Sequence, residues 1–362
     1  MTIRPRRSLL NPDLKRPSAL LSVPRDPNAL WLDKNENLNE ELIALGHETL
    51  KQIPALALAT YPEAAEIYRK LASWVGVPPE FLILTPGSDG AIRLVFEAFV
   101  EHGDTVVHTT PTFAMYPVYC QMFGAEATAI EYASSESGPG LDYAAIINAL
   151  HKHKPKLLCL PNPDSPTGTV FAPGDLRLIL KECESVEAIL LLDEAYHPFY
   201  EWSGVPWTET STNLIVARTF AKAWSAAGMR IGYAVAHPET LAYLHKMRPM
   251  YEVSTIAVEF MARMLDNVPA MLAAVASARS GKEFFVHEMG VLGFKVLPTH
   301  GNFVHVAFGE RGPRVHAALK SRVLYRSVFD QSCLSGYSRF TVAPREIMSK
   351  VVDMIKKVSD EK

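Results

Sequence analysis

The chain has 362 residues, of which 48% are hydrophobic and 21% are charged. This composition is that of a globular protein with room for about two domains, and it excludes a disordered chain, a collagen and a small disulfide-rich scaffold. Lysine and arginine together number 36 against 39 acidic residues, so the formal charge is -3 and no cationic excess favours a nucleic acid as partner.

The cysteines and the apolar runs narrow the class of protein further. The four cysteines lie far apart, without the C-x-x-C spacing of a zinc site or a redox pair, so we expect reduced structural thiols and no metal: Cys120, Cys159, Cys183 and Cys333. No run approaches the roughly 18 apolar residues of a membrane span. The basic segment from Met1 to Arg16 has no apolar stretch behind it. These observations predict a cytoplasmic protein that does not enter a membrane.

The first forty residues differ from the rest of the chain. They show little hydrophobic periodicity and contain five prolines, which predicts an extended arm: Pro5, Pro12, Pro17, Pro24 and Pro27. An arm of this kind often lies across a second subunit. The segment therefore also favours a dimer.

From Tyr61 to Pro249, helix-period segments alternate with short apolar runs. This alternation is typical of an α/β domain whose mostly parallel sheet is covered by helices. Amphipathic helices are expected at Glu63–Val75 and at Asp89–Glu101, the second with Ser88 as its cap. The sheet is expected to contain seven buried strands, at Phe81–Leu84, Thr105–Thr109, Thr128–Tyr132, Leu157–Leu160, Ala188–Leu192, Leu214–Arg218 and Gly232–Ala236.

After Pro249 the order of the elements changes. A long helical stretch runs from Val253 to Met289 with a break at Pro269, and mixed strands and helices follow through Phe303–Phe308 and Ser338–Val342. This pattern predicts a second, smaller α+β domain. The expected division is an arm that joins the small domain over 1–40, a large domain over 41–249 and a small C-terminal domain over 250–362.

The segment from Arg218 to Arg230 is the most informative part of the sequence. Lys222 follows an apolar strand, stands between small residues and precedes Arg230 by eight positions. A lysine is ordinarily a solvated surface charge. At the carboxyl end of a buried strand, however, an amine can be desolvated and made nucleophilic toward an aldehyde. The position of Lys222 favours this second interpretation.

Three other polar segments also follow strands. Asp193 comes directly after apolar residues and is either a cap or turn acid, or a carboxylate that keeps a ligand's ring nitrogen protonated. Asn162–Gly168 is either a simple turn or a loop that contacts a ligand. Gly87–Gly90 opens a helix with free N–H groups that suit an anion, although a plain helix cap also explains it.

Other chemistries have little support in the sequence. No G-x-G-x-x-G motif follows a strand, and Ser280-Gly281-Lys282 lacks the earlier glycine of a phosphate-binding loop, so nucleotide binding is not predicted. His151 and His153 stand beside lysines at the end of an amphipathic segment, with no third ligand nearby. This context favours a solvated helix end over a metal site.

Together these segments resemble the fold type I pyridoxal-phosphate enzymes, most closely the histidinol-phosphate aminotransferase-like subgroup. Near the C-terminus, Arg326 and Arg339 stand in contexts similar to those in which the family binds substrate anions. The resemblance covers nearly the whole chain and depends on Leu32-Asp33-Lys34-Asn35-Glu36-Asn37, Tyr61-Pro62, Gly87-Ser88-Asp89, Pro111-Thr112-Phe113, Ser165-Pro166-Thr167-Gly168, Asp193-Glu194-Ala195-Tyr196, Arg218 to Gly232 and Asn302-Phe303.

The resemblance implies a role for each site residue. Lys222 would bond to the cofactor aldehyde and shuttle a proton, Asp193 would keep the pyridine nitrogen protonated, and Tyr196 would donate to the phenolic oxygen. The other implied cofactor contacts are Phe113, which stacks on the ring, Asn162 and Ser165 in the loop, and the phosphate ligands Ser88, Asp89, Thr219, Arg230 and Tyr61. Tyr61 would come from a neighbouring subunit, which requires a homodimer with shared active sites. The implied substrate contacts are Arg339, which would clamp an α-carboxylate, together with Arg326, Tyr251 and Asn37.

Several positions depart from the family pattern near the cofactor. Ser165 replaces an asparagine that donates to the phenolic oxygen, and Ala221 replaces a serine that binds the phosphate. Leu38 replaces a proline that ends the Asn-Glu-Asn motif, and Glu252 places a negative charge where the subgroup has an amide. These departures weaken the expectation that histidinol phosphate is the substrate.

The first hypothesis is therefore a pyridoxal-phosphate-dependent aminotransferase that moves an amino group from an amino acid, with L-glutamate as the expected donor, to a small oxo-substrate. The alternative keeps the cofactor but breaks another bond, as in a decarboxylase of a phosphorylated amino acid or in an oxidase. A third hypothesis is a non-catalytic cofactor-binding module of a regulator. Forty proline-rich residues are too few for a winged helix, which argues against it.

Overall fold

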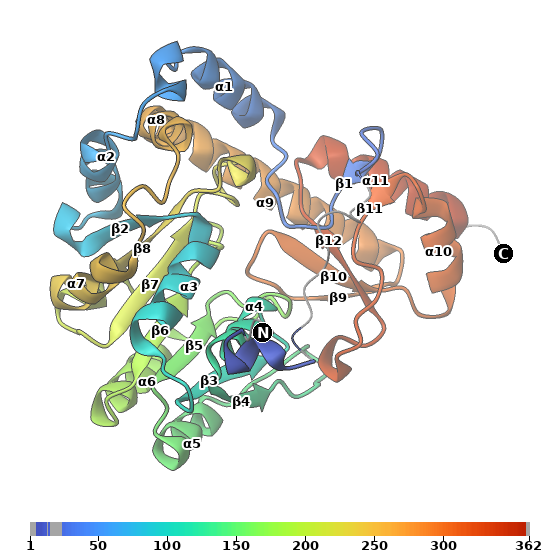
Figure 1. The fold of residues 1–362 in the computed structure, drawn as a ribbon. Coiled ribbons are helices and arrows are strands. Elements are labelled where there is room, and N and C mark those ends of the chain that lie inside the picture. Colours follow the sequence, from blue (N-terminus) through green and yellow to red (C-terminus); the bar gives the residue numbers. More distant parts are fainter. Residues whose placement is uncertain (1–4, 13, 15–23, 360–362) are drawn as a thin grey trace.

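The fold is built around one seven-stranded sheet (Figure 1), and the computed structural model describes residues 5–12, 14 and 24–359. The spatial order of the strands is β2-β8-β7-β6-β5-β3-β4, and β8 runs antiparallel to both of its neighbours while the other pairs are parallel. All seven predicted strands are present, so the predicted α/β class is confirmed: β2 (Leu82–Thr85), β3 (Thr105–Thr110), β4 (Glu126–Glu131), β5 (Leu157–Pro161), β6 (Ile189–Asp193), β7 (Leu214–Thr219) and β8 (Gly232–Ala236).

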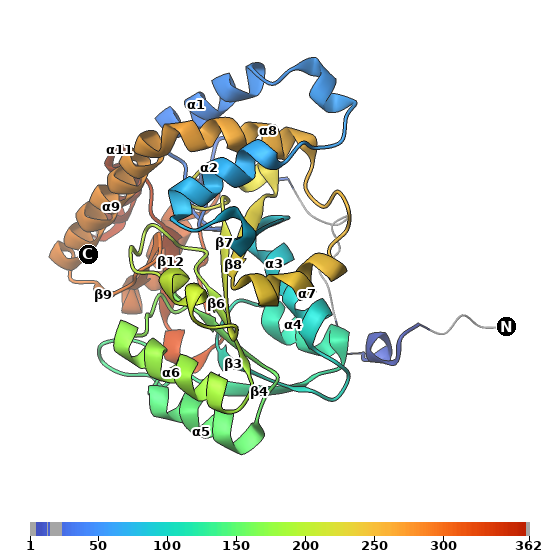
Figure 2. The same ribbon diagram turned by 90° about the vertical axis from the view of Figure 1, so that its left-hand side faces the viewer.

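The sheet is buried on both faces because alternate residues of each strand point to opposite sides. In β6, Leu190 and Leu192 belong to one hydrophobic core, whereas Ile189 and Leu191 belong to the other. Figure 2 shows helices on both sides of the sheet. The first core includes α2 (Ala65–Val75), α5 (Tyr143–His153) and α6 (Pro173–Ser185), and the second includes α3 (Gly87–Phe99), α4 (Met115–Phe123) and α7 (Pro238–Met247).

The start of α3 corrects one detail of the sequence analysis. The helix begins at Gly87 and not at Asp89, and Pro86 occupies the N-cap position without a side-chain cap bond. Gly87 has a φ of 78°, a left-handed conformation that glycine adopts without strain. It therefore makes the turn from β2 into the helix. Ser88 is already inside the first turn, so its hydroxyl is not a cap.

The C-terminal part has a core of its own. The predicted break at Pro269 is present: α8 (Thr255–Met264) ends before it, and α9 (Val268–Val291) carries the proline in its first turn, where it is tolerated. A three-stranded antiparallel sheet packs with α9 and two further helices, and comprises β9 (Lys295–Leu297), β10 (Phe303–Ala307) and β12 (Tyr337–Thr341), with α10 (Gly312–Leu319) and α11 (Arg345–Ser359).

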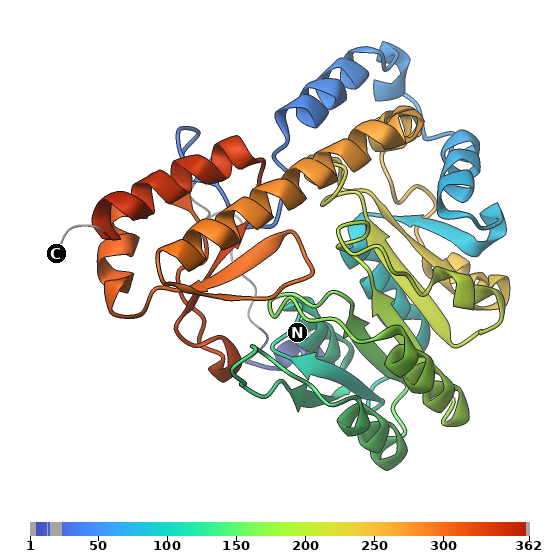
Figure 3. The same cartoon turned by 180° about the vertical axis from the view of Figure 1, so that it is seen from behind.

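The long helix α9 connects the two parts of the molecule, and Figure 3 shows it in orange across the back of the chain. Met271 and Val275, near its start, belong to the core that includes α8 and one face of the large sheet. Phe285 and Met289, near its end, belong to the C-terminal core. The division at 41–249 and 250–362 stays a prediction. Because α9 contributes side chains to both cores, it connects the two parts.

The N-terminal segment joins both parts. Ser8 Oγ donates to the Met122 carbonyl at the end of α4 (2.8 Å), and α1 (Glu40–Lys51) contacts α8 and α9. The short strand β1 (Leu30–Trp31) pairs in parallel with β11 (Val323–Leu324). Pro17 lies outside the described residues. The segment from 24 to 39 therefore lies beside the C-terminal part, where it can reach the edge of the large sheet.

Two further expectations concern the whole chain. The four cysteines are free and buried, in agreement with structural thiols. Of the helices within the described residues, none is both long enough and apolar enough to span a bilayer.

The packing of α9 against the segment before α11 gives a test of the fold. A Cβ atom at Gly281 would lie 1.9 Å from the Ala343 carbonyl oxygen, whereas one at Gly290, in the same helix, meets nothing within 4 Å. We expect Gly281→Ala to lower the free energy of unfolding by about 1–3 kcal/mol or more, because the backbones must separate. Gly290→Ala should raise it by up to about 1 kcal/mol, because alanine favours the helix. Urea denaturation of both variants measures the difference, and equal midpoints would contradict this packing.

Candidate active site

A cavity of about 440 Å³ lies at the carboxyl ends of the central strands. Strands β5, β6 and β7 are parallel neighbours, so their carboxyl ends meet at one edge of the sheet. Residues from the N-terminal segment and from β12 close the other side. The cavity wall brings together most of the predicted residues: Ser88, Asp89, Phe113, Ser165, Asp193, Tyr196, Thr219, Lys222, Arg230, Arg326 and Arg339.

Lys222 lies in the cavity wall three residues after the end of β7. Its Nζ donates to the carbonyl oxygen of Lys34 (2.7 Å). Burial and the positive charges of Arg339 and Arg230 together lower the pKa of Lys222 to about 8, while two nearby carboxylates oppose the shift. About a tenth of the side chain is therefore uncharged at pH 7, and the uncharged amine is the form that attacks a carbonyl carbon.

Two contacts from the N-terminal segment hold the irregular backbone around Lys222. Asn37 Nδ2 donates to the Ala223 carbonyl (3.0 Å), and Ser225 Oγ donates to the Asn37 carbonyl (2.8 Å). Trp224 is buried and meets Trp74 edge to face at 5.2 Å. These contacts fix the segment that directly follows the lysine, so its amine has a defined direction.

Asp193 is the last residue of β6, and its carboxylate is buried. Tyr116 Oη donates to Oδ2 (3.0 Å), and the Ala195 N–H donates to Oδ1 (3.0 Å). Burial raises the pKa of Asp193 to about 6, and these two hydrogen bonds oppose that rise. A protonated nitrogen placed against this carboxylate would gain a partner that water does not screen. Tyr116 was not predicted, although it lies in the first turn of α4 and meets the Phe113 ring edge to face (5.8 Å).

Tyr196 lies beside the N-terminal segment, fully buried. Asn35 Nδ2 donates to Tyr196 Oη (2.7 Å), which leaves the phenolic hydrogen free to donate into the cavity. Burial raises the pKa of Tyr196, while Arg339 and hydrogen bonds with Ser165 and Asn35 lower it. Asn35 was also missed as a site residue. Its motif was noticed, but nothing in the sequence distinguishes Asn35 from Asn37.

One end of the cavity is built for an anion. The first turn of α3 begins here with Gly87 and Ser88, and its N–H groups have no helical acceptor. Arg230 lies against this turn. A Cβ atom added at Gly87 would be only 3.0 Å from the Nη2 atom of Arg230. Gly232 allows this close approach, since a Cβ atom there would lie 2.6 Å from the Gly87 carbonyl carbon. Thr219, at the end of β7, completes this part of the wall.

Two arginines lie at the other end of the cavity. Arg339, in β12, is largely buried, and its guanidinium donates to the Asp33 carbonyl (3.0 Å) and to Ser165 Oγ (3.4 Å). Its Nε has no partner among the described residues. Arg326 is exposed, and it pairs with Arg339 through two backbone hydrogen bonds of 3.0 and 2.8 Å. The pair suits a ligand carboxylate, for which a guanidinium provides two parallel donors.

Asp164 fixes the loop that carries Ser165. Its buried carboxylate accepts hydrogen bonds from the Thr167 hydroxyl (2.6 Å), the Thr167 N–H (3.1 Å) and the Thr112 hydroxyl (3.1 Å). Burial raises the pKa of Asp164 to about 7 against these bonds. The loop is thus a rigid turn whose Ser165 lines the cavity, and its contact with a ligand stays a prediction.

Four predicted residues lie outside the wall of this cavity. The Asn37 side chain is engaged with the backbone near Lys222, and Asn162 is buried with its Oδ1 accepting from the Phe171 N–H (2.9 Å). Tyr61 and Tyr251 stack on each other at the surface, with ring centroids 4.1 Å apart and planes 10° from parallel. The structure therefore places Asn37 and Asn162 as supports of the cavity, and the two tyrosines away from the cavity of their own chain.

No metal centre accompanies this site. Within the described ranges, no three histidine, cysteine or acidic side chains are grouped so that they could hold an ion. His151 is exposed and pairs instead with Glu182 (2.8 Å). The cavity wall itself offers an amine, carboxylates, a phenol and three guanidinium groups.

Comparison with known proteins extends over most of the chain. Residues 27–355 match the family described as aminotransferase class I and II. The chain is 31% identical to a histidinol-phosphate aminotransferase of Caldanaerobacter subterraneus subsp. tengcongensis, covering 88% of this chain and 91% of the relative. It is 32% identical to one from Symbiobacterium thermophilum, covering 90% and 89%.

Solved structures share the fold. The histidinol-phosphate aminotransferase of Sinorhizobium meliloti, in complex with pyridoxal-5'-phosphate, aligns with a TM-score of 0.78 at 21% identity and covers 91% of each chain. The enzyme from Clostridium acetobutylicum aligns with a TM-score of 0.79 at 19% identity, covering 92% of this chain and 100% of that one. With the resemblance in its sequence confirmed by these matches, the chain belongs to the aminotransferase class I and II family.

Proposed function

We propose that this protein is a pyridoxal-phosphate-dependent transaminase that takes an amino group from an amino acid, with L-glutamate as the expected donor, and transfers it to a small oxo-substrate. The observation that carries the proposal is the placement of Lys222, Asp193 and Arg230 around one cavity. The family match supports transamination over the decarboxylase and oxidase alternatives, and the relatives are named as aminotransferases. A cytoplasmic location stays a prediction.

The residues of the cavity fit the proposed cofactor. The first turn of α3 and Arg230 would hold its phosphate, and Ser88 and Thr219 would add hydroxyl donors. Phe113 would lie against the ring. When bound, the cofactor supplies an electron-withdrawing ring that stabilises negative charge at the Cα atom of an amino acid. Ala221 offers no hydroxyl to the phosphate, so Arg230 and the helix N-terminus carry more of this interaction.

Four side chains would do the work of proton transfer and orientation. Lys222, with its lowered pKa, would bond to the aldehyde carbon and then carry a proton to and from the substrate Cα. Asp193 would hold the proton on the ring nitrogen. Tyr196 would donate to the phenolic oxygen, and Ser165, which lies between Tyr196 and Arg339, would stand in for the asparagine of the family pattern.

The arginine pair supports an acidic amino donor. Arg339 would hold the α-carboxylate, since its guanidinium is fixed by Asp33 and Ser165. Arg326 is exposed at the edge of the cavity and would bind a second carboxylate there. Its guanidinium lies over the Phe329 ring at 4.7 Å. Glutamate has a carboxylate at each end of a short chain, so one would bind Arg339 and the other Arg326. The oxo-substrate would bind to the same residues after the first product leaves.

We further propose a homodimer in which Tyr61 of the partner subunit contacts the cofactor phosphate. Tyr61 is 71% exposed and lies away from its own cavity. It belongs to an exposed apolar surface, here called the tyrosine face, whose members are Leu56, Leu58, Tyr61, Met250 and Tyr251. Apolar side chains grouped at a surface indicate a protein contact. A second copy of this chain would bury them and bring Tyr61 toward the partner's cavity.

Covalent labelling tests the role of Lys222. Borohydride reduction of the protein with bound pyridoxal phosphate should leave the added mass on the peptide that contains Lys222. Lys282 is an internal control, because burial also lowers its pKa to about 8 but it does not line this cavity. Peptide mass mapping identifies the modified lysine. An adduct on Lys282, or none at all, would contradict the proposal.

Two buried aspartates give a matched test of the proposed ring contact. Asp193→Asn removes the charge that would face the ring nitrogen, so kcat should fall by at least about a hundredfold, the scale for one preorganised electrostatic contact. Asp164→Asn removes a buried carboxylate that does not line the cavity, so it should lower the melting temperature with a much smaller loss of kcat. Steady-state kinetics and thermal unfolding separate the two effects. Equal losses of kcat would argue against a special role for Asp193.

Charged substitutions in the tyrosine face test the proposed dimer. Wild-type protein should have twice the 40.1 kDa mass of one chain, and Leu58→Asp combined with Met250→Asp should reduce it to one chain, since both side chains are about four-fifths exposed and would be buried in the dimer. Leu178→Asp, at an exposed apolar position on α6, is the control and should remain dimeric. Sedimentation equilibrium measures the masses. A monomeric wild-type protein would contradict the proposed dimer.

A further inference from the structure

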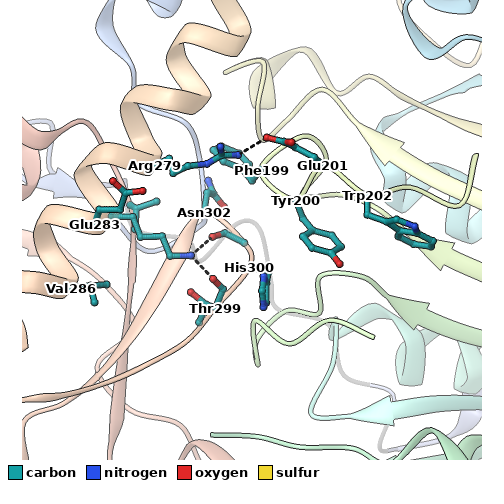
Figure 4. Close-up of a pocket in the computed structure, with 13 residues that line it drawn as sticks. Phe199, Tyr200, Glu201, Trp202, Arg279, Glu283, Val286, Thr299, His300 and Asn302 are labelled. Carbon is teal, nitrogen blue, oxygen red and sulfur yellow. Dashed lines mark hydrogen bonds and ion pairs between the residues drawn. The ribbon is translucent and has the colours of Figure 1, made fainter. Parts of the chain in front are cut away.

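A second cavity, of about 530 Å³, is shown in Figure 4 and shares no lining residue with the active-site cavity. One wall comes from Phe199–Trp202, the segment that follows Tyr196, and the opposite wall comes from the middle of α9. The loop from Thr299 to Asn302 and Val342 form the rest. The cavity therefore lies where α9 passes from the core of the large sheet to the core of the C-terminal part.

Two polar groups in the wall of this cavity, one half-buried and one buried, have unused bonding capacity. Lys282 Nζ donates to the carbonyl oxygens of Thr299 (2.5 Å) and Gly301 (3.0 Å), and an ammonium group has a third hydrogen to donate. Asn302 is 1% exposed, and its Oδ1 has no partner among the described residues. A buried amide oxygen without a donor is unfavourable. Lys282 therefore lacks one acceptor, and Asn302 lacks one donor.

The charges of the wall are balanced. Arg279 and Lys282 contribute two positive charges, and Glu201 and Glu283 contribute two negative charges. Figure 4 shows the ion pair of Arg279 with Glu201, whose atoms are 3.0 Å apart. A balanced wall does not favour a multiply charged anion such as a phosphate ester. It suits a molecule that carries one charge of each sign.

The apolar part of the wall is aromatic. Phe199, Tyr200 and Trp202 come from one short segment, and Tyr200 meets the His300 ring edge to face at 5.4 Å. Flat side chains of this kind bind a flat apolar group by stacking or edge contact. The ligand that satisfies the wall is thus small, flat at one end and zwitterionic at the other.

We propose that this second cavity binds a free aromatic α-amino acid, with its carboxylate on Lys282, its ammonium on the Oδ1 atom of Asn302 and its ring against Tyr200 and Trp202. The site does not depend on the proposed cofactor or on transamination. Hydrogen bonds connect this cavity to the active site. Asn302 Nδ2 donates to the Asn35 carbonyl (3.0 Å), and the Asn35 side chain donates to Tyr196. A ligand held by Asn302 therefore contacts the network that positions the Tyr196 phenol.

Calorimetric titration of the holoenzyme with L-phenylalanine tests the proposal. Arg339→Ala removes the carboxylate clamp of the active site, so the binding that remains in this variant belongs elsewhere. Val286→Trp should fill the second cavity and abolish that binding, and Lys282→Met should weaken it at least tenfold. Leu272→Trp, at an exposed position of α9 outside the cavity, is the matched control and should bind normally. Thermal unfolding shows whether each variant is folded.

The chemical class of the ligand is tested with two fragments. 3-Phenylpropanoate lacks the ammonium group and 2-phenylethylamine lacks the carboxylate, so each should bind at least tenfold more weakly than L-phenylalanine. The absence of any binding in Arg339→Ala, or binding that survives both Val286→Trp and Lys282→Met, would overturn the assignment of the site. Equal binding of either fragment would overturn the zwitterionic ligand. The borohydride experiment on Lys222 is independent of all these outcomes.

Discussion

The active site depends on two ionisable groups of opposite sign that the fold removes from water at the ends of neighbouring strands. Burial raises the pKa of Asp193 at the end of β6 and lowers that of Lys222 just after β7. With these pKa values Asp193 remains mostly a carboxylate near neutral pH, which suits a cationic partner, whereas part of Lys222 is an uncharged, nucleophilic amine. The free energy cost of this burial is offset by specific hydrogen bonds, from Tyr116 and the Ala195 N–H to the acid and from the lysine to the Lys34 carbonyl.

Two adjacent acids, Asp193 at the end of β6 and Glu194 directly after it, point in different directions and have different functions. Asp193 faces the cavity, whereas Glu194 is turned toward Arg218, with a closest N to O distance of 2.8 Å, and also accepts from Ser203 and the Gly204 N–H. This fully paired acid holds the loop after β6 against β7. That same loop continues through Tyr196 to Phe199, so it forms a wall of both cavities. One strand end thereby determines the shape of both sites.

Two departures from the family pattern have neighbours that would compensate for them. Ser165 is shorter than an asparagine, but Asn35 Nδ2 also donates to the Tyr196 oxygen. Ala221 contributes no hydroxyl, and the Arg230 guanidinium lies directly on the first turn of α3. The glycines at 87 and 232 make this contact possible, because a Cβ atom at either position would meet a neighbouring group at 3.0 Å or less.

The sequence by itself determined the seven strands, the break at Pro269, the position of Asp193 and Lys222 at or just after strand ends and that of Arg230 just before a strand, because burial pattern and strand boundaries are local properties. Only the tertiary structure decided which polar atoms meet. Tyr116 reaches Asp193 across 77 positions and Asn35 reaches Tyr196 across 161, so no local pattern identifies these pairs. The same reason explains why Asn37 and Asn162 support the cavity from outside. Hydrogen bonds between distant segments depend on how the sheet, α9 and the N-terminal segment pack, and that packing is a property of the whole chain.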